Sequence, residues 1–140
     1  MREVITLPAE RRVLSRIAHL IDRYASFLNF NASELHDVQV AAAEACTNAI
    51  VHGLHEDPSR TFEFTIEAAS DTLTIVLRED GTPFDPGNVS PADLTSGLQR
   101  RKIGGLGIYL IDKLMDSVNY STESDGMKVV RMTKRAGGKI

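Results

Sequence analysis

Residues 44–53 read EACTNAIVHG, and this stretch decides how the rest of the chain is interpreted. It lies at the end of a segment whose apolar residues recur at helical spacing, so it should belong to a helix that packs into a core. Glu44, Asn48 and His52 are four residues apart and therefore share one face of that helix. Packing into a core does not require three polar side chains on one helical face, so these residues need another explanation.

The helix that contains this stretch carries two stripes of side chains. Asn31 and Glu34 have the spacing of a capping box at its start, and Gly53 suits a C-terminal stop after His52. One stripe has the spacing of a buried face and the other is mostly polar. The first consists of Leu35, Val38, Ala42, Ala45 and Ala49, and the second of Asp37, Ala41, Glu44, Asn48 and His52. Packing explains the first stripe and leaves the second unexplained.

The remaining elements follow from hydrophobic periodicity and turn residues. The sequence predicts a strand at 3–7, a helix over 8–28 with Pro8 in its first turn, and strands at 61–68 and 72–80 that form a hairpin. A third helix follows residue 104, with Leu110, Ile111, Leu114 and Met115 inward, and strands at 117–123 and 127–135 form a second hairpin turned at Ser124, Asp125 and Gly126.

This order of elements predicts an α+β fold. We expect a two-layer sandwich in which a mixed, mainly antiparallel sheet of four to five strands is covered on one face by three helices. The elements do not alternate as strand, helix, strand, so a Rossmann fold is not expected. The 140 residues are read as a single domain, 1–140.

Composition excludes several classes of function. A net charge of -3 offers no basic footprint for nucleic acid. No run of 18 apolar residues is present, so neither a membrane span nor a membrane partner is expected. The first residues lack the apolar region of a signal peptide, and the lone Cys46 cannot form an internal disulfide. The expected location is the cytoplasm.

Residues 78–86, REDGTPFDP, end the second strand of the first hairpin. Asp-Gly and Thr-Pro pairs are common in turns, so a plain turn is one interpretation. In the other, Asp80 accepts a hydrogen bond from an amino group of a ligand, and Gly81 lets a flat ligand approach the backbone.

Residues 104–107, GGLG, open the third helix. They are either a flexible entry to the helix or a cradle that directs backbone N–H groups, with the helix dipole, toward phosphates. The cluster is neither a Walker A motif nor a GxGxxG fingerprint. The loop before it spans 81–104, and a loop of that length inside a compact domain is usually functional or disordered.

The chemistry of Glu44 and Asn48 also admits two interpretations. They could face solvent or pair with a basic side chain elsewhere. Alternatively, the carboxylate of Glu44 serves as a general base, and the amide oxygen of Asn48 binds Mg²⁺, a hard cation. One helical turn apart, the two side chains would point at the same phosphate site.

In chain order, the E-x-x-x-N helix, the DGTPFDP segment and the GGLG helix entry resemble the GHKL (Bergerat-fold) ATPase superfamily over essentially the whole chain. The wording NAIVHG and GGLGIYLIDKLMD is most similar to the anti-sigma factor serine/threonine kinases of the RsbW and SpoIIAB type. Sensor histidine kinases are the rival, but an imidazole acceptor needs no base. Glu44 therefore favours a hydroxyl or water as acceptor.

The resemblance implies ATP and Mg²⁺ as cofactors and assigns a role to each site residue. Glu44 is the general base and Asn48 holds Mg²⁺, while Asp80 binds the adenine amino group. The ATP lid covers about 86–103. The other nucleotide-binding positions are His52, Gly81, Pro83, Arg100, Arg101, Gly104, Gly105, Leu106 and Gly107.

Two protein partners and a homodimer are also implied by the resemblance. They are a sigma factor that the protein sequesters and a STAS-domain anti-sigma antagonist that it phosphorylates. Several family members have Gly-Thr at the start of the last strand, where this chain has Gly126-Met127, so the threonine contact to adenine is in question. Two alternatives stay open: a nucleotide-binding regulatory module without kinase activity, and a switch kinase that acts on a scaffold protein.

Overall fold

The protein is described here by a computed structural model that covers residues 1–81 and 105–137. In chain order the described elements are β1 (Arg2–Pro8), α1 (Val13–Ala25), α2 (Ala32–Thr47), the π-helix η1 (Asn48–Gly53), β2 (Thr61–Ala69), β3 (Thr72–Glu79), α5 (Gly105–Leu114), β4 (Ser117–Thr122) and β5 (Lys128–Arg135).

The strands of this part of the chain form one five-stranded sheet in the order β1-β2-β3-β5-β4. Every neighbouring pair in it is antiparallel, including the predicted hairpins β2–β3 and β4–β5. The strands β2 and β3 place Phe62, Phe64, Ile75 and Leu77 among their buried residues and leave Glu63, Val76 and Arg78 more exposed, as expected for a sheet with one covered face. The sheet predicted as mixed is therefore antiparallel throughout its described strands.

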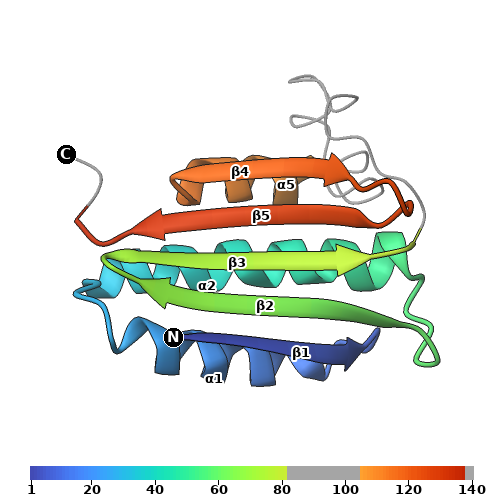
Figure 1. Ribbon diagram of the computed structural model, residues 1–140, viewed down its shortest axis with the longest axis horizontal. Helices are drawn as coiled ribbons and strands as arrows, with labels where there is room; N and C mark the ends of the chain where they lie inside the picture. Colours follow the sequence, from blue (N-terminus) through green and yellow to red (C-terminus); the bar gives the residue numbers. More distant parts are fainter. Residues whose placement is uncertain (82–104, 138–140) are drawn as a thin grey trace.

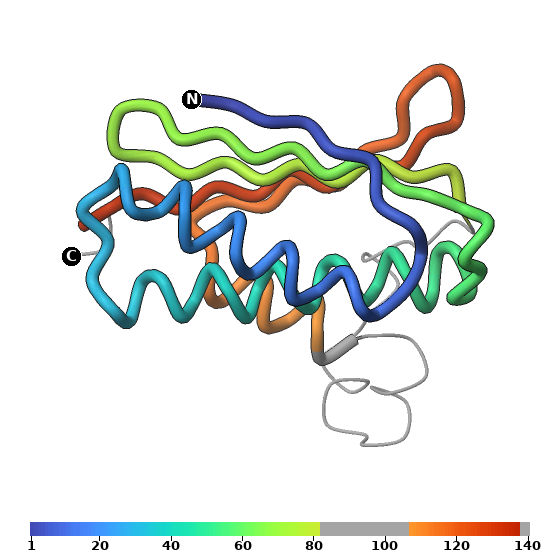
Figure 2. The backbone as a smooth tube through the Cα atoms, turned by 90° about the horizontal axis from the view of Figure 1, so that it is seen from below, coloured from blue at the N-terminus to red at the C-terminus, as the bar shows by residue number. Residues whose placement is uncertain are grey.

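The helices α1, α2 and α5 all lie on one face of the sheet, and the other face is open (Figure 1 and Figure 2). The core fills the space between the two layers. Its largest fully buried side chains include Tyr24, Phe62, Phe64 and Ile75. This arrangement confirms the predicted two-layer α+β sandwich. No helix in the described ranges has the length and apolar character needed to cross a membrane.

The first helix is shorter than predicted, because Pro8 ends β1 and does not begin the helix. Pro8 pairs with Thr61 at the end of β1, which is an edge strand of the sheet. An edge strand tolerates a residue that has no N–H to donate. The expectation that Pro8 lies in the first helical turn was therefore wrong.

The second helix begins as predicted and ends differently. Asn31 and Glu34 form the expected capping box, with the Glu34 N–H donating to Asn31 Oδ1 at 2.7 Å and the Asn31 N–H donating to Glu34 Oε1 at 2.9 Å. The α-helix then stops at Thr47, and Asn48–Gly53 continue it as a π-helix. The predicted single α-helix to His52 is therefore two helical segments.

The polar stripe of the second helix faces α5. At one end, Lys134 of β5 donates to the Leu114 carbonyl of α5 at 2.7 Å and lies 3.5 Å from Asp37 Oδ2. At the other end, Gly107 of α5 lies against Glu44 and Asn48. A helix that packs against both a sheet and a second helix needs two inward faces, which is why Ala41, in the polar stripe, is fully buried.

Candidate functional site

The central feature of the candidate site is the contact between α2 and the first turn of α5. A Cβ atom on Gly107 would lie 2.7 Å from Glu44 Oε2 and 3.6 Å from Asn48 Nδ2. A side chain at position 107 would force the Glu44 carboxylate to shift, so the glycine lets the start of α5 approach this carboxylate closely. Glu44 and Asn48 are both half-buried, one turn apart on the same helical face.

The start of α5 contributes backbone polarity to this place. The first N–H groups of an α-helix have no partner inside the helix, and the helix dipole adds positive charge there. Such an end is suited to binding phosphate. A carboxylate, a carboxamide and a helix N-terminus thus meet in one place. This set can bind a phosphate through the backbone, a hard cation through the amide oxygen, and a proton through the carboxylate.

The π-helix begins at Asn48, within the site. Its wider turns are visible in the backbone hydrogen bonds, where the Leu54 N–H donates to the Ala49 carbonyl at 2.9 Å. Short π-helical segments occur frequently at functional sites. After it, His55 and Glu56 both have positive φ, at 57° and 54°, so the chain reverses sharply. The π-helix brings Gly53 to the end of β3.

A buried carboxylate lies between two glycines at that end of the sheet. Glu79 is 8% exposed, and its Oε2 would be 2.3 Å from a Cβ on Gly53 and 2.5 Å from one on Gly81. Among the described residues this oxygen has no hydrogen-bond partner. Burial raises the pKa of the Glu79 carboxyl, while the Gly81 backbone N–H and the charge of Lys128 oppose the rise. A buried acceptor without a partner is unfavourable unless a ligand supplies a donor.

Asp80, to which the family resemblance assigns the adenine contact, has a different environment. Its side chain is 67% exposed, and Arg60 donates to its Oδ1 at 2.9 Å. The structure does not bring Asp80 into the glycine-lined position that Glu79 occupies. The sequence analysis missed Glu79, although the inward alternation of Leu73, Ile75 and Leu77 continues to residue 79. Continuing that alternation would have identified it.

The other predicted site residues divide into two groups. Gly81 packs against the Gly53 carbonyl, and His52 is half-buried in η1. Gly105, Leu106 and Gly107 form the first turn of α5. Pro83, Arg100, Arg101, Gly104 and the lid predicted at about 86–103 lie outside the described residues.

The fit to a magnesium ion rests on Asn48. In the described part of the chain, no group of three or more His, Cys, Asp or Glu side chains is placed to hold a metal. Mg²⁺ usually takes only one or two protein ligands and completes its shell with water and substrate phosphates. Asn48, beside the helix end suited to phosphate, fits that pattern. The ion would neutralise charge on phosphate oxygens when bound.

Comparison with known proteins gives matches along most of the chain. The sequence model of the family described as histidine kinase-like ATPase domain matches residues 7–134. The chain is 33% identical over 142 residues to the serine-protein kinase RsbW of Listeria monocytogenes, with 96% of this chain and 88% of that protein covered. It is 30% identical over 134 residues to RsbW of Halalkalibacterium halodurans, with 93% and 80% covered.

Two solved structures share the fold. The crystal structure of the RsbU and RsbW domains of a Mycobacterium tuberculosis protein matches with a TM-score of 0.67 at 16% identity, over 96% of this chain and 32% of that one. The SiaB–SiaC complex from Pseudomonas aeruginosa contains a chain that matches with a TM-score of 0.56 at 17% identity, over 94% and 88%. At these identities the likeness concerns the fold alone.

Proposed function

The chain belongs to the histidine kinase-like ATPase domain family, and from this premise we propose that it is an ATP-dependent protein serine/threonine kinase that acts as an anti-sigma factor. Its protein substrate is a STAS-domain anti-sigma antagonist, and the partner that it sequesters is a sigma factor. The relatives named serine-protein kinase RsbW support this assignment, since the alignments cover most of both chains. Two copies associate as a homodimer.

One observation carries the proposal: Glu44 and Asn48 meet the start of α5 at Gly107. In phosphoryl transfer the protein chiefly positions the reactants and stabilises charge. The N–H groups at the start of α5 bind the phosphates, and Asn48 holds Mg²⁺. Glu44 accepts the proton that the serine hydroxyl loses as its oxygen bonds to the γ-phosphorus and the bond to the leaving ADP oxygen breaks.

The adenine end of the site lies at Glu79. The sequence assigns the amino-group contact to Asp80, but two features favour Glu79 for this role. Its Oε2 lacks a partner among the described residues, and the two glycines beside it have no side chain that would crowd its carboxylate. Asp80 already accepts a hydrogen bond from Arg60 and faces solvent. We therefore assign the acceptor of the adenine amino group to Glu79.

The test is single-turnover transfer of ³²P from ATP to a STAS-domain antagonist. Glu44→Gln is nearly isosteric and removes the base, so the transfer rate should fall by about 10²–10⁴-fold while ATP still binds. Glu67→Gln, which removes a carboxylate from the open face of β2, is the matched control and should transfer at the wild-type rate.

Three outcomes would count against parts of the proposal. A folded Glu44→Gln protein that transfers phosphate at the wild-type rate would contradict the base assignment. ATP binding by the wild type without transfer to any antagonist would favour a regulatory module that only binds nucleotide. Transfer to a scaffold protein, with no binding to a sigma factor, would favour a switch kinase.

A further inference from the structure

The first residue of β5, Lys128, lies directly opposite Glu79 of β3. The two are Cα partners in the antiparallel register of these strands. Directly opposed residues of an antiparallel pair have their side chains on the same face of the sheet. Glu79 faces the helices, because its carboxylate contacts Gly53. Lys128 therefore lies on the same helix-covered face, at the end of the sheet that carries the candidate adenine site.

Met127, which the sequence analysis set against a family threonine, does not lie opposite Glu79. It precedes β5, and its N–H donates to Asp125 Oδ1 at 3.0 Å within the turn between β4 and β5. The β5 residue that faces Glu79 is thus Lys128, one position later in the chain. A cationic side chain, and not a thioether, borders the buried carboxylate.

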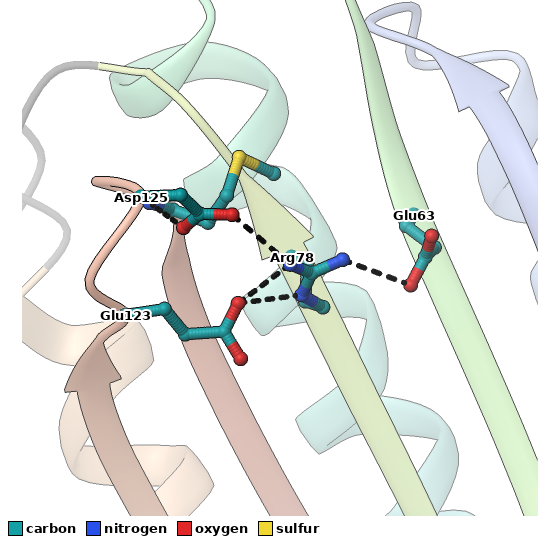
Figure 3. Close-up of polar contacts among 5 residues, drawn as sticks. Glu63, Arg78, Glu123 and Asp125 are labelled. Carbon is teal, nitrogen blue, oxygen red and sulfur yellow. Dashed lines mark hydrogen bonds and ion pairs between the residues drawn. The ribbon is translucent and has the colours of Figure 1, made fainter.

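A network on the open face holds this turn in place (Figure 3). Arg78 donates through Nε to Glu123 Oε1 at 3.1 Å and lies 3.7 Å from Asp125 Oδ2. It also reaches Glu63 Oε1 on β2 at 3.5 Å. The turn before β5 is therefore tied to β2 and β3 from the open face. This fixes the strand start that presents Lys128 to the opposite face.

Lys128 and Glu79 interact electrostatically but do not form an ion pair with each other. The positive charge of Lys128 opposes the rise in the pKa of the Glu79 carboxyl. Within the described residues, however, the ammonium group of Lys128 makes no hydrogen bond or ion pair, and Glu79 Oε2 has no partner. The half-buried ammonium can donate a hydrogen bond, and the buried carboxylate can accept one. Because the two stay apart, they are complementary to a ligand group that carries an acceptor and a donor side by side.

We propose that Lys128 and Glu79 together recognise one edge of the adenine base. The carboxylate of Glu79 accepts a hydrogen bond from the exocyclic amino group, and the ammonium of Lys128 donates to the ring nitrogen beside that group. This inference rests on the nucleotide site of the proposed function. Lys128 is then a specificity-determining residue, because a base without that ring nitrogen leaves its ammonium unpaired.

The test measures ADP binding by calorimetry and needs no turnover. The ligands are ADP, 1-deaza-ADP and 7-deaza-ADP, which lack one or the other ring nitrogen beside the amino group. The wild type should bind one of the two analogues about tenfold more weakly than ADP, as expected when a hydrogen bond to a charged group is lost. Lys128→Met should bind ADP about tenfold more weakly than the wild type does. It should bind that same analogue as tightly as it binds ADP.

The matched control is Arg131→Met, which removes a positive charge from the open face of the same strand. It should bind all three nucleotides as the wild type does. Equal binding of ADP and both analogues by the wild type would overturn the proposal without any variant. So would a Lys128→Met protein that binds ADP as the wild type does, or that binds all three ligands more weakly by one factor, which would indicate a general charge effect. Failure of the wild type to bind ADP would overturn the nucleotide site itself.

Discussion

At the residue scale, Glu79 shows that the alternation of side chains along a strand locates the buried carboxylate better than the Asp-Gly turn motif does. The Asp80-Gly81 pair attracts attention as a turn with a ligand-binding carboxylate. The period of two along β3 nevertheless directs residue 79 inward and residue 80 outward. The glycines at positions 53 and 81 make room for the inward carboxylate. Their role depends on a contact between segments far apart in the chain, so the sequence alone could not reveal it.

Replacing the carboxylate of Glu79 or of Asp80 by its amide tests which of the two accepts the hydrogen bond from the adenine amino group. Glu79→Gln should bind ADP about tenfold more weakly, because an acceptor that carries a charge is replaced by a neutral amide. Asp80→Asn should bind ADP nearly as the wild type does, since its exposed side chain contacts Arg60 and not the glycine-lined position. Calorimetry on both variants decides the matter. The reverse pattern would return the adenine contact to Asp80.

Stability should depend on pH through the same carboxyl group. Burial raises the pKa of Glu79 in the folded protein above its ordinary value of 4.5. Between pH 4.5 and the raised pKa the folded state therefore binds more protons than the unfolded state. The free energy of unfolding must fall as pH rises through that window and then stay level with respect to this group. The difference between wild type and Glu79→Gln in urea unfolding should show this fall. A difference that does not change with pH would contradict it.

At the scale of secondary structure, periodicity predicted the type of every described element except the π-helix η1, and several contacts between residues. The hairpins, the capping box and the inward residues Ile111 and Met115 were all predictable, because each depends on neighbours close in sequence. The π-helix was not, since one extra residue per turn barely changes the pattern of apolar residues over so short a segment. The end of β1 was misjudged because Pro8 suits both a helix start and an edge strand.

The α5 helix offers a test of how one element positions the site. Lys134 is 4% exposed, and its Nζ donates to the Leu114 carbonyl at the end of α5. Lys134→Met should lower the free energy of unfolding by about 1–3 kcal/mol, because that carbonyl and Asp37 lose a charged partner. Urea unfolding measures the loss, with Arg131→Met as the control on the same strand. An unchanged unfolding midpoint would show that the lysine does not hold α5.

At the scale of the whole molecule, the candidate site lies at one end of the two-layer sandwich. The sequence predicted that Glu44, Asn48 and the GGLG segment belong together, and the structure places Gly107 of that segment against both side chains. The roles assigned to these residues remain proposals. Pairing of β3 with β5, which brings Lys128 to Glu79, joins strands that are separated in the chain by α5 and β4. Short-range patterns carry no information about such a contact.

The meeting of α2 with α5, and of β3 with β5, also bears on the order of events in folding. Each of these contacts joins segments that are far apart in the chain, Glu44 with Gly107 and Glu79 with Lys128, so the nucleotide site is complete only after these long-range contacts have formed. A ligand that needs all of these contacts binds weakly to the folding transition state, because its site is still incomplete there. Adenine nucleotide should therefore slow unfolding and leave the folding rate nearly unchanged. It stabilises the folded protein but does not accelerate its folding.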